Sequence, residues 1–171
     1  MSLIVSFWTL AAQRRTELLD AFRPVQRSST ERRWLLFPQT KTETVYPWFD
    51  YIRANATEEA EFKYGGLAMV DLEVMLPKDV SLFSLALPES VELGEYSGAS
   101  VALIDEPTAR AAHARLSVVT LTATEIVRFH EADGRPLADA SEAEAILAAH
   151  RQLLKWCLTV IPGRIGLLMV G

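Results

Sequence analysis

The chain has 171 residues, of which 50% are hydrophobic, and it carries 8 glycines, 8 prolines and a formal net charge of −5. A chain of this length buries roughly 70% of its unfolded surface, and the composition excludes a disordered or fibrous protein. The negative net charge disfavours binding to the phosphate backbone of a nucleic acid. We therefore expect residues 1–171 to form a single globular domain without a nucleic-acid partner.

Cysteine content and hydropathy indicate in which cellular compartment we expect the protein. Cys157 is the only cysteine, so the chain cannot form an internal disulfide, and this pattern favours a reducing, cytoplasmic location. The apolar segment 3–12 lacks a preceding positive charge and is followed at once by the polar residues 13–15, so we expect no signal peptide. Because no stretch reaches the roughly 18 uninterrupted apolar residues of a membrane helix, we expect no membrane partner.

Charge is distributed unevenly along the sequence. Residues 1–40 carry six arginines against three acidic residues, whereas residues 41–171 carry 11 basic and 19 acidic residues. One interpretation is a solvated helix and loop that are rich in arginine, and the other is a basic docking patch. We favour the first interpretation.

The first 22 residues predict a strand followed by a helix. Segment 3–10 is rich in β-branched and aromatic residues on both faces, as in an interior strand. Segment 11–22 carries apolar residues at spacings of three and four, which is the helical period, and Pro24 ends the pattern.

From residue 24 to residue 104 the pattern is mainly that of loops and strands, interrupted by one helix described below. Residues 24–31 are polar and predict a loop, and the apolar run 33–38 predicts a short strand. Segment 67–76 alternates between two sets of side chains with the period of two that is typical of a strand with one solvated face. Proline and glycine punctuate three further predicted strands, over 82–87, 91–96 and 100–104.

Helix signals dominate the last third of the chain. Two acidic residues and a proline precede segment 108–115, which predicts a helix, and segment 116–121 predicts a strand. Thr122 with Glu125 matches a capping box, in which each side chain accepts a hydrogen bond from the other residue's backbone amide. This pattern predicts a helix over 123–131.

A second capping-box pattern, Ser141 with Glu144, opens the most periodic element, a long amphipathic helix over 142–160. Segment 164–170 is almost wholly apolar and predicts a final interior strand. The fold class that we expect is α+β: a mixed or mostly antiparallel sheet of about five to seven strands, with helices packed against it and the long helix followed by the last strand.

No motif identifies a catalytic residue, a cofactor site or a metal site. Cys157 and His150 are residue types used in nucleophilic catalysis, but seven helical residues separate them by about 10.5 Å, far beyond the roughly 3 Å that is needed. His130, Glu131 and Asp133 form a small cluster without the paired ligand spacing of metal sites. We favour a histidine that complements the helix dipole beside solvated acids. No glycine-rich phosphate-binding motif occurs either.

Segment 45–53 is the strongest candidate for binding, because it holds four aromatic residues, an acid and an arginine. Aromatic residues and arginine dominate the energetic hot spots of protein interfaces. A helix that begins at Pro47 would turn three apolar side chains inward: Trp48, Phe49 and Ile52. The candidate binding residues are Tyr46, Trp48, Tyr51 and Arg53.

Two classes of function stay open. A small acidic chain without a catalytic motif is typical of a protein-interaction module, such as a regulatory protein or an immunity protein that neutralises its partner by binding it. The alternative is an enzyme or small-molecule-binding domain whose site is assembled from distant segments. An interaction module would expose an aromatic or apolar patch, whereas an enzyme would show a pocket with titratable groups of shifted pKa.

Overall fold

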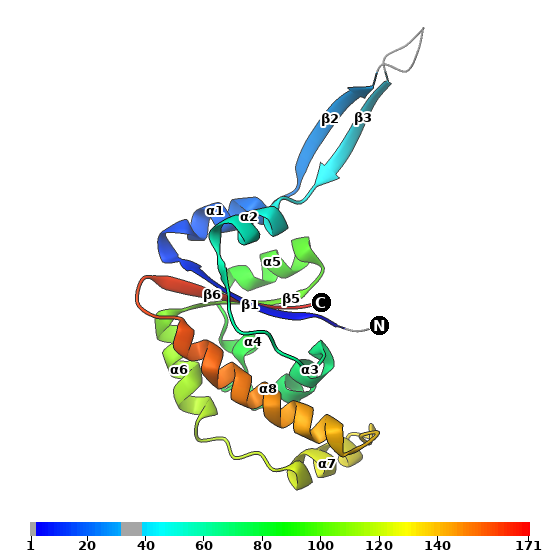
Figure 1. The fold of residues 1–171 in the computed structure, drawn as a ribbon, viewed down its shortest axis with the longest axis vertical. Coiled ribbons are helices and arrows are strands. Elements are labelled where there is room, and N and C mark those ends of the chain that lie inside the picture. Colours follow the sequence, from blue (N-terminus) through cyan, green and yellow to red (C-terminus); the bar gives the residue numbers. More distant parts are fainter. Residues whose placement is uncertain (1–2, 32–38) are drawn as a thin grey trace.

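The structure, a computed structural model, describes residues 3–31 and 39–171. Its strands form two antiparallel sheets, a four-stranded sheet in the order β4-β1-β6-β5 and a separate hairpin of β2 and β3 (Figure 1). The strands are β1 (Val5–Ala11), β2 (Val25–Glu31), β3 (Gln39–Val45), β4 (Thr57–Glu58), β5 (Ser100–Asp105) and β6 (Arg164–Val170).

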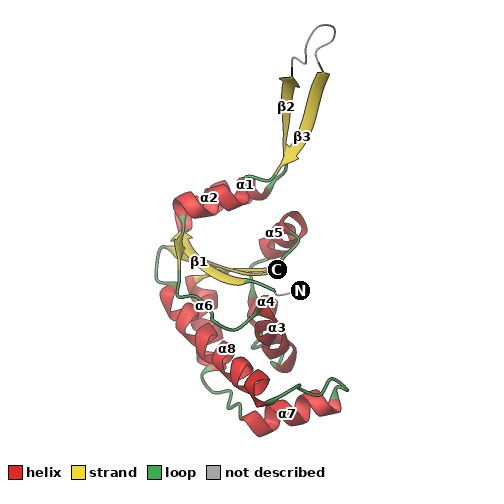
Figure 2. Cartoon of the chain, turned by 45° about the vertical axis from the view of Figure 1, so that its right-hand side comes forward, coloured by secondary structure: helices red, strands yellow, loops and turns green. Residues whose placement is uncertain are grey.

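Helices cover both faces of the four-stranded sheet, which gives the body three layers (Figure 2). One face is covered by α1 (Arg15–Phe22), α2 (Trp48–Asn55) and α5 (Glu89–Ser97). The other face is covered by α3 (Gly66–Met75), α4 (Leu82–Leu85), α6 (Glu106–Leu116) and α8 (Ala140–Thr159), and α7 (Ala123–Ala132) packs against α8 on the side away from the sheet (Figure 1). A short 3-10 helix, η1 (Ala12–Arg14), leads from β1 into α1. None of the helices in the described part of the chain combines the length and apolarity needed to cross a bilayer.

The predicted final strand is confirmed, and it lies in the interior of the sheet. β6 pairs with β1 on one side and with β5 on the other, so Val170 lies opposite both Val5 and Ser100. Side chains along β5 and β6 alternate between the two faces of the sheet. Ile104 and Leu168 join the core beneath α3, α6 and α8, whereas their neighbours Leu103 and Leu167 join the core beneath α1, α2 and α5.

The hairpin of β2 and β3 projects from the body beyond α1 and α2 (Figure 1). Its strands pair over seven positions, from Val25 opposite Val45 to Glu31 opposite Gln39, and they contact mainly each other. Side chains 25–29 and 42–44 are all exposed. The described side chains of the hairpin therefore bury almost no surface against the body.

Several local predictions are confirmed. The described helices include the elements expected over 11–22, 108–115, 123–131 and 142–160, with shifted ends. The capping box of α7 has both of its hydrogen bonds, with the Glu125 amide donating to Thr122 Oγ1 at 3.2 Å and the Thr122 amide donating to Glu125 Oε2 at 2.8 Å. Helix α8 begins two residues early, because Asp139 and not Ser141 is its N-cap.

Other local predictions are wrong. The main sheet has four strands, fewer than predicted, because segments 67–76, 82–87 and 91–96 are helical in α3, α4 and α5. Helix α3 is largely buried and carries apolar side chains on most of its sides. Its sequence therefore lacks a clear helical period and also fits the period of two that is typical of a strand. Segment 116–121 follows the end of α6 as turn and coil.

The polar segment 24–31 was expected as a loop, but residues 25–31 form β2, and the polar residues 39–44 form most of β3. Strands are recognised in a sequence by their apolar face, and the side chains described in this hairpin present none. The strand predicted over 33–38 lies outside the described residues.

Close approach of α3 to the chain before β1 requires glycine at residue 66, and this contact is testable. The Gly66 amide donates to the Leu3 carbonyl at 2.8 Å, and a Cβ on Gly66 would lie 2.6 Å from Leu3 Cβ. We expect Gly66→Ala to lower the free energy of unfolding by about 1–3 kcal/mol in urea titrations. Gly65→Ala is the matched control, since its Cβ would meet nothing closer than Leu3 O at 4.0 Å. Equal losses in the two variants would contradict this packing.

Candidate functional site

The predicted binding segment lies at the base of the projecting hairpin. β3 ends at Val45, Tyr46 follows, and Pro47 is the N-cap of α2. Tyr46 is 47% exposed and Phe49 is 49% exposed, one turn further along. The Arg53 guanidinium lies over the Phe49 ring, 5.6 Å from its centroid. We call Tyr46, Phe49 and Arg53 the α2 surface.

The inner face of α2 differs in part from the prediction. Ile52 is buried, as expected, and Trp48 is half-buried and stacked on Phe22 of α1 with 5.3 Å between ring centroids. Phe49 was expected to face inward, but about half of its surface is exposed. Its ring meets Trp48 edge-on at 5.6 Å, so Phe49 lies at the margin of the core, where a partner could contact it.

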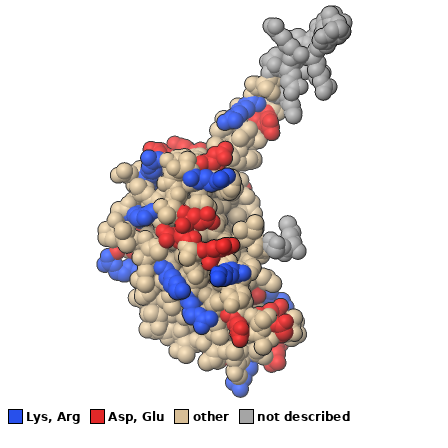
Figure 3. Space-filling model, viewed as in Figure 1, with Lys and Arg blue, Asp and Glu red and all other residues tan. Residues whose placement is uncertain are grey.

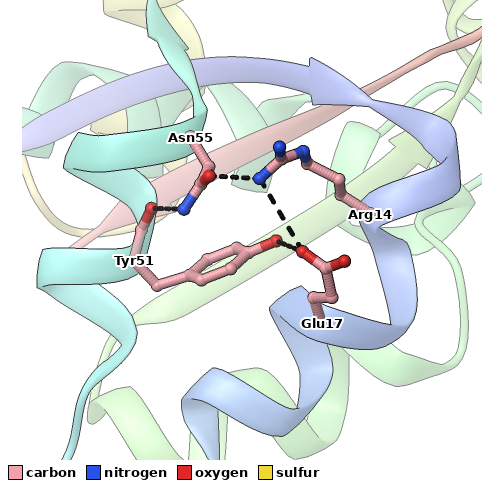
Figure 4. Close-up of polar contacts among 4 residues, drawn as sticks. All are labelled: Arg14, Glu17, Tyr51 and Asn55. Atoms are coloured by element: carbon pink, nitrogen blue, oxygen red, sulfur yellow. Dashed lines mark hydrogen bonds and ion pairs between the residues drawn. The ribbon is translucent and has the colours of Figure 1, made fainter.

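Tyr51 is held in a polar cluster that joins α2 to the start of α1 (Figure 4). The Tyr51 hydroxyl donates to Glu17 Oε2 at 2.9 Å, and the Arg14 guanidinium donates to Asn55 Oδ1. Arg14 also lies 3.7 Å from Glu17. Burial raises the pKa of the Tyr51 hydroxyl, and the Glu17 carboxylate raises it further, so the group donates a proton in this hydrogen bond. The cluster fixes the orientation of α2 relative to α1.

A hollow of about 290 Å³ lies beside the α2 surface, and we call it the α2 hollow. Its walls include Ile4, Trp8, Trp48, Phe49, Ile52 and Met169. None of the described residues that line it carries an ionisable side chain. The side chains that line the hollow therefore suit an apolar group.

Three arginines of the N-terminal region, Arg14, Arg15 and Arg23, are engaged in ion pairs. Arg15 contacts Glu89 of α5, while Arg23 lies 2.8 Å from Asp20 and 3.4 Å from Glu92. On the face drawn in Figure 3, positive and negative side chains are interspersed. These contacts support the interpretation of a solvated, arginine-rich helix over a basic docking patch.

The remaining candidates from the sequence do not converge. His130 is 3% exposed, and its Nε2 has no hydrogen-bond partner among the described residues. Glu131 is exposed on the same helix end, and Asp133 accepts a hydrogen bond from Arg135. His150 Nε2 lies 3.1 Å from the Leu116 carbonyl oxygen. In residues 3–31 and 39–171, no group of three or more histidine, cysteine, aspartate or glutamate side chains could hold a metal ion.

Cys157 is the residue most relevant to the enzyme alternative, because it lines a hollow of about 200 Å³ together with Glu106, Arg110 and His113. The thiol is buried, and desolvation raises its pKa to about 12 with a further contribution from the charge of Glu73. A thiol with this pKa is almost entirely protonated at neutral pH and is a poor nucleophile. The burial of Cys157 supports a structural role.

Glu73 is the other buried titratable group near this region. Desolvation raises the pKa of its carboxyl, against hydrogen bonds that lower it. Its carboxylate accepts hydrogen bonds from the Ser81 hydroxyl and, at 3.2 Å, from the Leu82 amide. Since Ser81 is the N-cap of α4, Glu73 ties α3 to the start of α4, and both of its oxygens are occupied by that structural contact.

Sequence reasoning found the aromatic segment but missed the hairpin and the α2 hollow. The hollow is assembled from β1, α2, the α5–β5 turn and the end of β6, so no spacing in the sequence could reveal it. Comparison of the chain with protein-family models, curated proteins and solved structures gives no significant match.

The raised pKa of Cys157 predicts low thiol reactivity in the native state. Because the chain has one cysteine, a thiol-specific reagent such as DTNB reports on this residue alone. At pH 8 we expect the native protein to react roughly 100-fold more slowly than the protein unfolded in urea. Rapid stoichiometric labelling without denaturant would show that Cys157 is accessible and ionised. This result would support the enzyme alternative.

The raised pKa of Glu73 predicts that replacing this residue with a neutral one raises the free energy of unfolding by an amount that depends on pH. Below the usual pKa of 4.5 the carboxyl is protonated in both the folded and the unfolded protein, so its burial as a charge does not lower the free energy of unfolding. As pH rises through 4.5 and then through the raised folded pKa, burial of the charge destabilises the native state. We expect Glu73→Gln to unfold at a higher urea concentration than the parent at pH 7, with the difference shrinking toward pH 4. A difference that is independent of pH would contradict this assignment.

Proposed function

We propose that this chain is a protein-interaction module, of the regulatory or immunity type, whose partner contacts the β2–β3 hairpin and the α2 surface at its base. The observation that carries the proposal is the projecting hairpin itself. A two-stranded hairpin is marginally stable in water when it packs on nothing. A partner that covered it would bury surface that the body leaves exposed.

Backbone groups of the hairpin supply one part of the interaction. β2 and β3 pair only with each other in the described sheets, so the outer edge of each strand presents unpaired N–H and C=O groups. Such an edge is a template for strand addition by another chain. Neither strand contains a proline that would block this pairing.

Side chains at the base of the hairpin supply the second part. Tyr46, Phe49 and Arg53 are the residue types that dominate interface hot spots, and Phe49 also forms a wall of the α2 hollow. An apolar side chain of a partner would fill this hollow and bury both tryptophans that line it, Trp8 and Trp48. Tyr51, bonded to Glu17, would then position α2 and not contact the partner.

The enzyme alternative has less support. No described residue that lines the α2 hollow has an ionisable side chain, and the hollow beside Cys157 holds a thiol with a pKa of about 12. A reducing, cytoplasmic location and the absence of a nucleic-acid partner remain part of the proposal, supported by the single buried cysteine and the acidic composition.

The test begins with identification of the partner by native mass spectrometry, after capture from the source lysate through a tag on a long flexible linker. With the purified partner, we expect Phe49→Ala with Arg53→Ala to raise the Kd at least about tenfold, because both hot-spot side chains are lost. We expect a variant with residues 26–44 replaced by Gly-Gly to lose binding while its free energy of unfolding changes by less than about 1 kcal/mol.

Val118→Ala is the matched control for these variants. Val118 is an apolar side chain that is 79% exposed and lies outside the α2 hollow, so its removal should leave the Kd unchanged. The proposal is wrong if no stoichiometric protein partner is found, or if the partner binds the parent and the hairpin variant equally well.

A further inference from the structure

Residues 32–38 connect the two strands of the hairpin and lie outside the described part of the chain. Their sequence is Arg-Arg-Trp-Leu-Leu-Phe-Pro, in which residues 34–37 are four consecutive large apolar residues. We call residues 34–37 the apolar run. Contact of such a run with water costs free energy, so it favours an apolar surface that covers it.

The apolar run cannot reach the α2 hollow of its own chain. The strands of the hairpin have seven residues each, so Glu31 stands about 20 Å from Val25 at the base. Seven residues that leave Glu31 and return to Gln39 extend at most about 14 Å from that end, because one residue spans at most about 3.6 Å. The main chain of the run therefore stops short of the base, and the α2 hollow lies beyond the base, in the body (Figure 1).

The α2 hollow of a second copy has the chemistry that the apolar run requires. Ile4 is 72% exposed and Phe49 is 49% exposed, so two apolar side chains of its walls are open to a partner. Trp8 and Trp48 are half-buried in the same walls. The volume of about 290 Å³ is just below the roughly 300–1,000 Å³ of small-molecule sites and admits one aromatic side chain.

Trp34 is the residue of the apolar run that best matches these walls. Its ring offers a large apolar surface to Trp8 and Trp48, and its indole N–H needs an acceptor when it is buried. The hydroxyls of Ser6 and Ser97 lie among the walls and can accept that hydrogen bond. Leucine and phenylalanine offer these hydroxyls no donor.

Each copy of the chain thus carries an apolar run and a hollow that its own run cannot reach. A two-fold dimer in which each hairpin reaches into the other copy covers both, and the exchange of identical elements is a low-cost route to dimers. An aromatic side chain buries about 150–250 Å², so Trp34 and Phe37 of two copies bury about 600–1,000 Å². With an equal area of the walls that they cover, the total reaches the roughly 1,200–2,000 Å² of stable interfaces.

We propose that the chain forms a two-fold dimer in which Trp34 of each copy occupies the α2 hollow of the other. This proposal rests on the interaction function proposed above, because it names the side chain that fills the same hollow. A different protein that filled the hollow would displace Trp34 and separate the two copies.

The test is analytical ultracentrifugation of the purified full chain at up to about 100 μM, where an interface of this size associates. We expect a dimer whose Kd rises at least about 100-fold in Trp34→Ser, because a hot-spot tryptophan is lost from both contacts. Ser6→Trp should weaken the dimer as strongly, because its own indole fills the hollow. Val118→Ser is the matched control, since Val118 is 79% exposed and lies outside the hollow, and its Kd should equal that of the parent.

A mixture of the two variants identifies the contact itself. Trp34→Ser keeps the hollow and Ser6→Trp keeps the apolar run, so a mixed dimer can form one of the two contacts. We expect native mass spectrometry to show the mixed dimer in the mixture and far less dimer in either variant alone. Thermal unfolding checks that the variants are folded, and Ala99→Leu, at another wall of the hollow, replaces Ser6→Trp if that variant does not fold.

Three results overturn the proposal: a parent chain that stays monomeric at the highest concentration, a dimer that Trp34→Ser leaves unchanged, or a mixture without the mixed dimer. The purified chain is the only protein in this experiment. Its failure is therefore distinct from failure of the proposed function, which is tested by capture of a different protein from the lysate.

Discussion

Strand β6 joins the two halves of the main sheet, because β1 and β5 have no contact in the ladder except through it. Its residues 165–170 are all buried, and they alternate between the two cores. Packing against β6 is tight: a Cβ on Gly166 would lie 2.6 Å from Phe7 Cζ and 2.7 Å from Val160 Cγ2. The helices on both faces pack on a sheet whose continuity depends on this one strand, which explains why residues 164–170 are almost wholly apolar.

Elements with a local sequence signal were predicted, and elements without one were not. Segment 164–170 and the α7 cap were found because a two-sided apolar run and a capping box are local and have one structural meaning. α3 was mistaken for a strand because it is apolar on most sides, so burial removed the helical period. The hairpin was missed for the opposite reason, since its described side chains bury nothing and leave no period at all.

The candidate site shows the same division between local and distant information. The helix that follows Pro47 was predicted from the sequence, but the exposure of Phe49, whose ring meets Trp48 edge-on where Trp48 stacks on Phe22, was not. The α2 hollow also depends on distant parts of the chain, because its walls come from β1, α2, the α5–β5 turn and the end of β6.

The position of β6 also has a consequence for biosynthesis. β1 is made first, yet its long partner is made last, and Val5 must wait for Val170 before their ladder can close. Until then the apolar strand β1 and the inner face of β5 are exposed on the nascent chain, a condition that favours aggregation and chaperone binding. Pairing between such distant residues also slows folding. The main sheet can therefore close only after residues 164–170 have been synthesised.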